Sequence, residues 1–398
     1  MLLVGDFIPK GLRVQLPESF GRELILANLE GPVCAEDLPI SNKAGVCLHS
    51  APFDIPGRWA FALANNHTMD FQEEGLHQTQ TFLQGKGYLF AGAGDTEEEA
   101  RKPMILEENG IRIAVFSCCE RQFGMATGTT AGCAAMGVWL YGAIRSVKES
   151  NKADRVIVSC HAASEFCPWP SPQLREFYHS LIDAGADCIH GHHAHVPQGY
   201  EEYSGRPIFY GLGNFVVKVD DWGDFPHYRW SYVIDVHFEG QEVKWVVKPI
   251  SLSIQDRTIM CRPPVEEQKL MIGHYTQSAC FALESDQQAE ACWQEAACRL
   301  YHRLYEQSLR APSVRTWKLS LRDRLRKLFF ASGDIVRAVI GRELTTCKSL
   351  RRAKVIYNYL NCASHAELIQ TALGVQTNVI RDIRTMETAH RANELLLE

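Results

Sequence analysis

Side chains that can bind metal ions stand at the ends of several short apolar runs in this sequence. A carboxylate, a carboxamide or an imidazole follows each of these runs, in chain order: Asp6, Glu30, Asn66, His67, His161, His193 and His195. Carboxylates and imidazoles together suit borderline divalent ions such as Mn, Fe or Zn. Two such ions about 3.5–4 Å apart can activate water and clamp a transferring phosphoryl group. The pattern therefore predicts a metal-centred hydrolase site that holds one or two divalent ions.

The residue types suggest different roles within this site. Glu30 is the best candidate for an acid that bridges two ions, and Asn66 offers a neutral carbonyl oxygen as a ligand. His67 need not be a ligand, and is predicted to act as an acid or to polarise the substrate. Asp70 could hydrogen-bond His67 or cap the following helix. Asn214 could supply an amide to the substrate, or could be only a turn residue.

Four histidines fall within six positions, at His190, His192, His193 and His195. A lone histidine is usually structural, but a cluster of this density favours metal ligation for His193 and His195. Alternate residues of an extended segment point the same way. We therefore expect His193 and His195 to face the metals and His192 to face away, as a neighbour of the ligands.

Short apolar runs alternate with helical segments over residues 1 to 250. Strands are predicted at 2–5, 24–28, 61–65, 113–117, 156–160, 188–191, 208–212, 231–238 and 242–250. The first seven are nearly continuous apolar runs, typical of strands buried on both faces. The last two resemble a hairpin, and helices are expected at 75–84 and 171–184. This alternation predicts an α/β layered fold, in which ligands bind beyond the carboxyl ends of the strands.

The character of the chain changes after residue 255, which divides it into a first domain, 1–255, and a mainly helical, basic region, 256–398. Residues 310–354 contain thirteen Lys or Arg, although the whole chain has a net charge of −6. The stretch 316–330 reads as a basic amphipathic helix. It could contact an anionic membrane surface or a polymer synthase, or it could pack on its own domain with a solvated basic face.

The bulk composition excludes several classes of protein. The acidic net charge leaves no global basic footprint, so a nucleic-acid partner is not expected. The chain shows no signal-peptide pattern and no long apolar run, which predicts a cytoplasmic location. The fourteen cysteines form no CxxC pair and favour buried free thiols over a zinc site. Cys160 precedes His161, but adjacent strand residues face opposite ways, so a Cys–His nucleophile is not expected.

Six motifs in order resemble the CapA/PgsA family of bacterial capsule and poly-γ-glutamate biosynthesis proteins. They are GD (5–6), NLEGPV (28–33), LANNHTMD (63–70), GL (75–76), AGAG (91–94) and the long segment 185–217 that contains GHHAH. The resemblance covers roughly residues 1–250. It implies a calcineurin-like metallophosphoesterase fold, a four-layer α/β/β/α sandwich. It also implies that Lys43, in SNKAG, corresponds to a lysine common in this family; otherwise Lys43 would be a solvated loop residue.

Two departures from the family pattern affect the predicted site. The wider superfamily usually has a histidine two residues after the first aspartate, where this chain has Ile8, so one metal would have fewer ligands. The family often has glycines between the middle histidine and a following glutamate, where this chain reads HAASE at 161–165. Glu165 would then either orient His161 or be a surface acid.

Three functions remain open from the sequence. The first is a metal-dependent, phosphoesterase-like hydrolase connected with capsule or exopolymer biosynthesis, which acts on an anionic small molecule or polymer. The second is a non-catalytic assembly factor of an anionic-polymer synthase. The third is an amide or peptide hydrolase that uses the same metals, since both reactions need an activated water.

Overall fold

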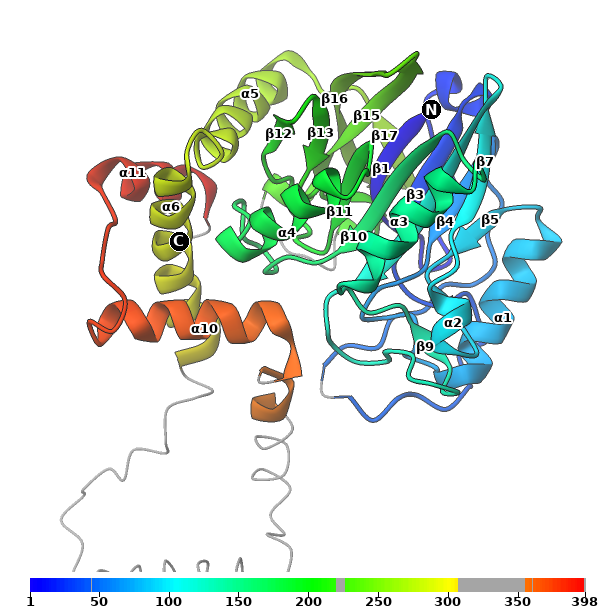
Figure 1. Ribbon diagram of the computed structural model, residues 1–398, viewed down its shortest axis with the longest axis horizontal. Coiled ribbons are helices and arrows are strands. Elements are labelled where there is room, and N and C mark those ends of the chain that lie inside the picture. Colours follow the sequence, from blue (N-terminus) through cyan, green and yellow to red (C-terminus); the bar gives the residue numbers. More distant parts are fainter. Residues whose placement is uncertain (44, 220–225, 307–354, 360, 397–398) are drawn as a thin grey trace, which may run out of the picture.

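Two β-sheets stacked face to face form the centre of the molecule in the computed structural model (Figure 1). The structure describes residues 1–43, 45–219, 226–306, 355–359 and 361–396. The first sheet has the order β2-β17-β16-β15-β1-β3-β4-β5, with β14 paired to β1, and the second has the order β12-β13-β11-β10-β8-β7. The basic stretch 310–354 and its predicted amphipathic helix lie outside the described residues.

The first sheet contains β1 (Leu2–Ile8), β2 (Arg13–Gln15), β3 (Leu24–Leu29), β4 (Arg58–Ala62), β5 (Leu89–Ala91), β14 (Asn214–Val217), β15 (Trp230–Glu239), β16 (Glu242–Gln255) and β17 (Thr258–Arg262). The second contains β7 (Met104–Glu108), β8 (Ile111–Cys119), β10 (Arg155–His161), β11 (Cys188–His192), β12 (Tyr200–Tyr203) and β13 (Arg206–Phe209). A small separate sheet pairs β6 (Ala93–Gly94) with β9 (Gly132–Cys133). Each of the nine predicted strands overlaps an observed strand.

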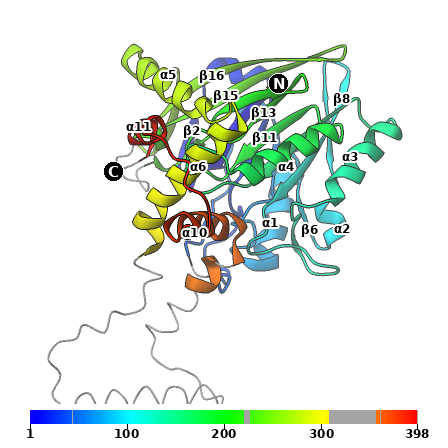
Figure 2. The same ribbon diagram turned by 60° about the vertical axis from the view of Figure 1, so that its left-hand side comes forward.

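Helices cover the outer face of each sheet. The helices of this part are α1 (Gln72–Gly85), α2 (Glu97–Ala100), α3 (Trp139–Glu149) and α4 (Pro172–Asp183), with short 3₁₀ turns η1 (Glu18–Arg22) and η3 (Pro226–Tyr228). Leu76 and Leu83 of α1 pack in one apolar cluster with Phe61 of the first sheet. Ile144 of α3 and Leu181 of α4 pack with Val158 of the second sheet, and Figure 2 shows α3 and α4 lying over that sheet. The predicted α/β/β/α layering is therefore confirmed.

Local sequence signals account for several of these elements. Helix α4 begins at Pro172 because the Ser171 hydroxyl accepts a hydrogen bond from the Leu174 N–H, and it ends before Gly185, whose φ is +113°. Strands β15 and β16 form the expected hairpin, with Gly240 in a left-handed turn. The predicted boundary at residue 255 falls between β16 and β17, so the sheet extends to residue 262.

The space between the sheets is apolar at one end of the strands and polar at the other. Leu26, Val115 and Ile157 belong to the cluster between the sheets. Every second side chain along a strand points to the same face. Asn28, two positions after Leu26, and His161, four positions after Ile157, therefore point to the same face as these apolar residues. On these two strands the inner face therefore changes from apolar to polar toward the carboxyl end.

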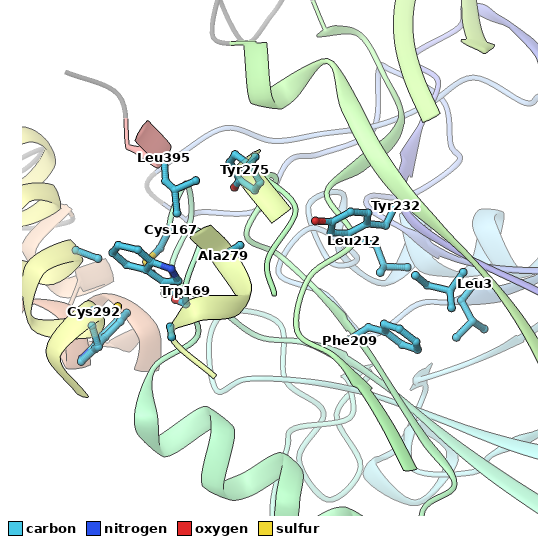
Figure 3. Close-up of a cluster of buried hydrophobic side chains, with 14 of the residues drawn as sticks. Leu3, Cys167, Trp169, Phe209, Leu212, Tyr232, Tyr275, Ala279, Cys292 and Leu395 are labelled. Carbon is cyan, nitrogen blue, oxygen red and sulfur yellow. The ribbon is translucent and has the colours of Figure 1, made fainter. Parts of the chain in front are cut away.

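A helical region packs against one end of the sandwich. It contains α5 (Glu266–Phe281), α6 (Asp286–Leu300), the π-helical turn η4 (Tyr301–Tyr305), α10 (Ala363–Gln376) and α11 (Met386–Leu395). Figure 3 shows its apolar side chains continuing the cluster between the sheets, from Tyr232 through Trp169 to Cys292 and Leu395. Arg175 of α4 adds polar contacts to Glu201 and to Asp286 of α6. The two parts therefore share one core.

The cysteines that the structure describes are free and mostly buried, as expected from the sequence. Thirteen cysteines are free thiols, and all but two of them are buried. Cys160 lies in the outer apolar cluster of the second sheet, on the face opposite His161, so the Cys–His pairing is absent as expected. Among the described helices, none combines the length and the apolar character needed to cross a membrane.

Candidate metal centre

Glu30, directly after β3, lies at the centre of the polar cluster between the sheets. Its side chain is fully buried, and neither carboxylate oxygen has a hydrogen-bond donor among the described residues. Two imidazoles lie close to it: the His195 Nε2 atom is 3.4 Å from Oε1, and the His161 Nε2 atom is 3.9 Å from the same oxygen. Burial raises the pKa of Glu30 to about 8. A buried carboxylate without donors is costly unless a proton or a cation compensates it.

Two overlapping sets of ligand atoms surround this carboxylate. One set is Glu30, His161 and His193, and the other is Asp6, Glu30 and His195; within each set the ligand atoms lie within 4.8 Å of one another. The Asn66 Oδ1 atom is 3.0 Å from the His161 Nε2 atom and extends the first set. All six predicted metal ligands are thus brought together, and their mixed N and O donors fit a divalent ion.

Asn28 orients ligands of both sets, although no site role was predicted for it. Its Nδ2 donates to Asp6 Oδ1 at 2.8 Å and lies 3.1 Å from His161 Nδ1. The His161 Nε2 atom is thereby left to face Asn66 and Glu30. Asn65 in turn donates to Asn28 Oδ1 at 3.2 Å. The signal in the sequence was the position of Asn28, two residues after the inward-facing Leu26.

The histidine segment corrects one expectation about orientation. Strand β11 ends at His192, and the backbone then turns left-handed at His193 (φ 88°) and at His195 (φ 58°). Alternation along an extended strand no longer applies there, so the prediction that His192 faces away is wrong. The His192 Nδ1 atom is 3.3 Å from Asp6 Oδ1. Positive φ is unfavourable for residues other than glycine, and such strain is typical of functional sites.

Asn214 contacts a ligand rather than an open space for substrate. Its Oδ1 lies 3.2 Å from His195 Nδ1, and Asp6 Oδ2 lies 3.4 Å from the same nitrogen. These acceptors leave the His195 Nε2 atom facing Glu30. Burial lowers the pKa of His195, but the carboxylates of Glu30 and Asp6 outweigh it and raise the pKa to about 10. Burial raises the pKa of Asp6, but the neighbouring His192 and His195 rings outweigh this effect and bring the pKa below its usual value.

His67, Asp70 and Lys43 form a separate group beside the first ligand set. The His67 Nδ1 atom is 2.6 Å from Asp70 Oδ2, so Nδ1–H donates to the carboxylate and Nε2 is left for a substrate. The Lys43 ammonium forms an ion pair with Asp70 and donates to the Asn66 carbonyl oxygen at 3.0 Å. Lys43 is therefore buried and paired, unlike a solvated loop lysine. Burial and the Lys43 charge lower the pKa of His67.

The structure also places the two positions that depart from the family pattern. Glu165 is half-buried, and its carboxylate lies within 4.8 Å of ligand atoms of His193 and His195. Glu165 is therefore not a plain surface acid, and it lies near two other histidines than the His161 that it was expected to orient. Its carboxylate could itself be a further metal ligand. The Ile8 side chain packs in the outer apolar cluster of the first sheet and supplies no ligand.

A known family covers most of this site. The family described as bacterial capsule synthesis protein PGA_cap matches residues 13–219, just over half of the chain. The chain belongs to this family. The resemblance to CapA/PgsA predicted from the motifs is thus confirmed. Within this capsule synthesis family match lie Glu30, His67, His161 and the histidine segment, whereas Asp6 and the helical region lie outside it.

Relatives in the capsule synthesis family match only part of their own length. A Mycobacterium tuberculosis protein named as a probable polyglutamine synthesis accessory protein is 32% identical over 241 residues, which are 56% of this chain and 62% of that protein. The capsule biosynthesis protein CapA of Bacillus anthracis is 31% identical over 206 residues, 49% of this chain and 50% of CapA. The chain thus spans less than two thirds of either relative.

A similarity among solved structures is weaker. A 5'-nucleotidase precursor from Thermus thermophilus aligns with 57% of this chain and 44% of its own, at 14% identity and a TM-score of 0.33. The assignment of the fold therefore depends on the sheet order and the helix packing described above.

Proposed function

We propose that this chain is a metal-dependent, phosphoesterase-like hydrolase that acts on an anionic substrate in capsule or exopolymer biosynthesis. One observation carries the proposal: the donor-free, buried carboxylate of Glu30 is shared by two sets of histidine and carboxylate ligands. Two divalent ions would share Glu30, one with Asp6 and His195 and the other with His161, His193 and Asn66. Such ions supply an activated water and clamp the reacting anion.

The remaining residues of the site act on protons and on geometry. Asp70 accepts a hydrogen bond from the Nδ1–H of His67, so the neutral ring leaves Nε2 unprotonated. This nitrogen can take a proton from the attacking water and then give it to the leaving group. Lys43 forms an ion pair with Asp70 and donates to the Asn66 carbonyl oxygen, and so it holds both groups in place. Asn28 and Asn214 hold the rings of His161 and His195 in the orientation that turns Nε2 toward Glu30.

Metal binding should release at least one proton near neutral pH. Because burial raises the pKa of Glu30 to about 8, the ion-free carboxyl keeps its proton below that pH, and a metal ion must displace it. The apparent Kd for Mn²⁺ should therefore decrease as the pH rises from about 6 to about 8. Titration calorimetry in two buffers of different ionisation enthalpy counts the protons. Binding without proton release would contradict the assignment of Glu30 as a ligand.

A pocket beside His67 is the proposed place for the substrate. It has a volume of about 270 Å³ and combines polar side chains with an apolar surface; its lining includes Ser41, Lys43, Asn66, Met69, Asp70, Phe123, Tyr357 and Asn358. Tyr357 and Asn358 come from the segment just before α10, so the helical region contributes to this wall.

Tyr357→Ala should raise KM about fivefold and leave kcat unchanged. Tyr357 is 63% exposed yet lines the pocket, and an aromatic contact of this kind contributes about 1 kcal/mol of uniform binding. Steady-state kinetics with metal analysis of the same sample tests this. Met386→Ala, at an exposed position away from the pocket lining, is the control and should change neither value.

Two other functions use the same residues. A non-catalytic assembly factor is favoured by Ile8, which supplies no ligand, and by the word accessory in the name of the mycobacterial relative. An amide or peptide hydrolase would need the same ligands. Two predictions from the sequence remain predictions. They are the cytoplasmic location and the contact of residues 310–354 with a membrane surface or a polymer synthase.

One experiment separates these functions. The purified chain is analysed for bound metal and then assayed with phosphomonoesters, phosphodiesters and glutamyl amides. The proposal predicts bound divalent metal and turnover of a phosphoester. Turnover of the amides alone would favour the amide hydrolase. Absence of bound metal, with His193→Ala leaving the biological function intact, would overturn both enzymes and leave the assembly factor.

A further inference from the structure

A chain of side-chain contacts joins the ligand His193 to the start of α10. Glu120 directly follows β8 and is buried, with its Oε1 atom 3.6 Å from His193 Nε2. The Gln122 Nε2 atom donates to Glu120 Oε1 at 2.6 Å and lies 3.1 Å from the same His193 nitrogen. The other ring nitrogen of His193, Nδ1, is buried and has no hydrogen-bond partner among the described residues. The ring therefore presents Nε2 to Gln122 and Glu120, which leaves Nδ1 as the nitrogen that could bind a metal ion.

The helical region holds Glu120 from the opposite side. The Ser364 hydroxyl donates to Glu120 Oε1 at 2.7 Å, and the Cys362 thiol lies 3.4 Å from the same oxygen. Ser364 and Cys362 stand at the first turn of α10, more than 240 residues from Glu120 along the chain. The Ala363 N–H also donates to the Arg121 carbonyl oxygen at 3.3 Å. Side-chain and backbone contacts together attach the start of α10 to this edge of the site.

We propose that Glu120 is a positioning residue for the metal ligand His193, and that Ser364 holds Glu120, so that the helical region tunes metal affinity. The proposal depends on the metal site proposed above. A ligating imidazole carries its proton on the nitrogen away from the ion, and an acceptor there fixes the ring and makes it a better ligand. Glu120 faces that nitrogen at 3.6 Å and also holds Gln122, whose side chain lies 3.1 Å from the same nitrogen. Ser364 lies outside the matched family region, so this control of the site belongs to the helical part of the chain.

The test measures Mn²⁺ affinity of the full chain and of four variants by titration calorimetry. Glu120→Gln should weaken Mn²⁺ binding by about 10–100-fold, and Ser364→Ala should weaken it several-fold. The double variant should bind no more weakly than Glu120→Gln alone, because Ser364 acts through Glu120. Ser171→Ala is the matched control: the Ser171 hydroxyl also ties α10 to the rest of the chain, through Glu367 at 2.9 Å, without contacting Glu120. It should bind Mn²⁺ like the parent.

A second readout separates positioning from folding. The visible absorption of bound Co²⁺ should shift in Ser364→Ala and stay unchanged in Ser171→Ala, whatever the two variants do to thermal unfolding in chelator. If Glu120→Gln does not fold, Ser364→Ala decides by itself. Parental Mn²⁺ affinity and a parental Co²⁺ spectrum in Ser364→Ala would overturn the inference alone. A parent chain that binds neither ion would overturn the proposed function and the inference together.

Discussion

Glu30→Gln should abolish stoichiometric binding of divalent metal and lower hydrolysis by roughly 10³-fold or more. Both sets of ligand atoms include this carboxylate, so the substitution removes the negatively charged ligand that both ions would share. Metal analysis after dialysis and steady-state assays measure the two effects. Glu267→Gln, at an exposed position on α5, is the control and should alter neither.

The same substitution should stabilise the metal-free protein. In the unfolded chain Glu30 loses its proton near its ordinary pKa of 4.5, whereas in the folded protein burial raises the pKa to about 8. The native state therefore binds more protons between these values, and the stability of the parent decreases as the pH rises through this window. Glutamine has no proton to lose. In chelator near pH 8, Glu30→Gln should unfold at a higher temperature than the parent; a lower temperature would indicate a structural acid instead of a ligand.

His67→Asn should lower kcat by about 10²–10⁴-fold and leave the metal content unchanged. The His67 Nδ1 atom is committed to Asp70, and His67 belongs to neither ligand set around Glu30. The substitution therefore removes the ring nitrogen that would exchange a proton with water and the leaving group, and it keeps the ligands. Asp70→Asn should show a smaller loss, because the ring remains but its orientation and tautomer are no longer held.

The control for His67 is His77→Asn. His77 is exposed on α1 and contacts Asp95, so its loss should not affect turnover. Kinetics and metal analysis are carried out on the same preparations. If the metal content of His67→Asn fell in parallel with its activity, His67 would be a ligand, and the division of roles between His67 and Asn66 would be wrong.

The amino-acid pattern by itself predicted a layered α/β fold and the residues of the candidate metal centre, whereas the α/β/β/α order of the layers was implied by the resemblance to the family. Apolar runs that alternate with helices predict a layered α/β fold, because the periods of strand and helix are properties of neighbouring residues. The change from Leu26 to Asn28 along one strand face, and from Ile157 to His161 along another, places polar groups at the carboxyl ends of the strands. The motifs then resemble one family, whose model matches residues 13–219.

Tertiary structure alone decided how these residues face one another. The left-handed backbone at His193 and His195 cannot be read from strand alternation, and it turned His192 toward Asp6 instead of away. Two other features appeared only in the structure. One is the ion pair of the Lys43 side chain with Asp70, and the other is the series of contacts from His193 through Glu120 to Ser364. Local periodicity is set by adjacent residues, whereas these contacts join segments up to 244 residues apart. Their geometry depends on how the two sheets and the helical region pack together.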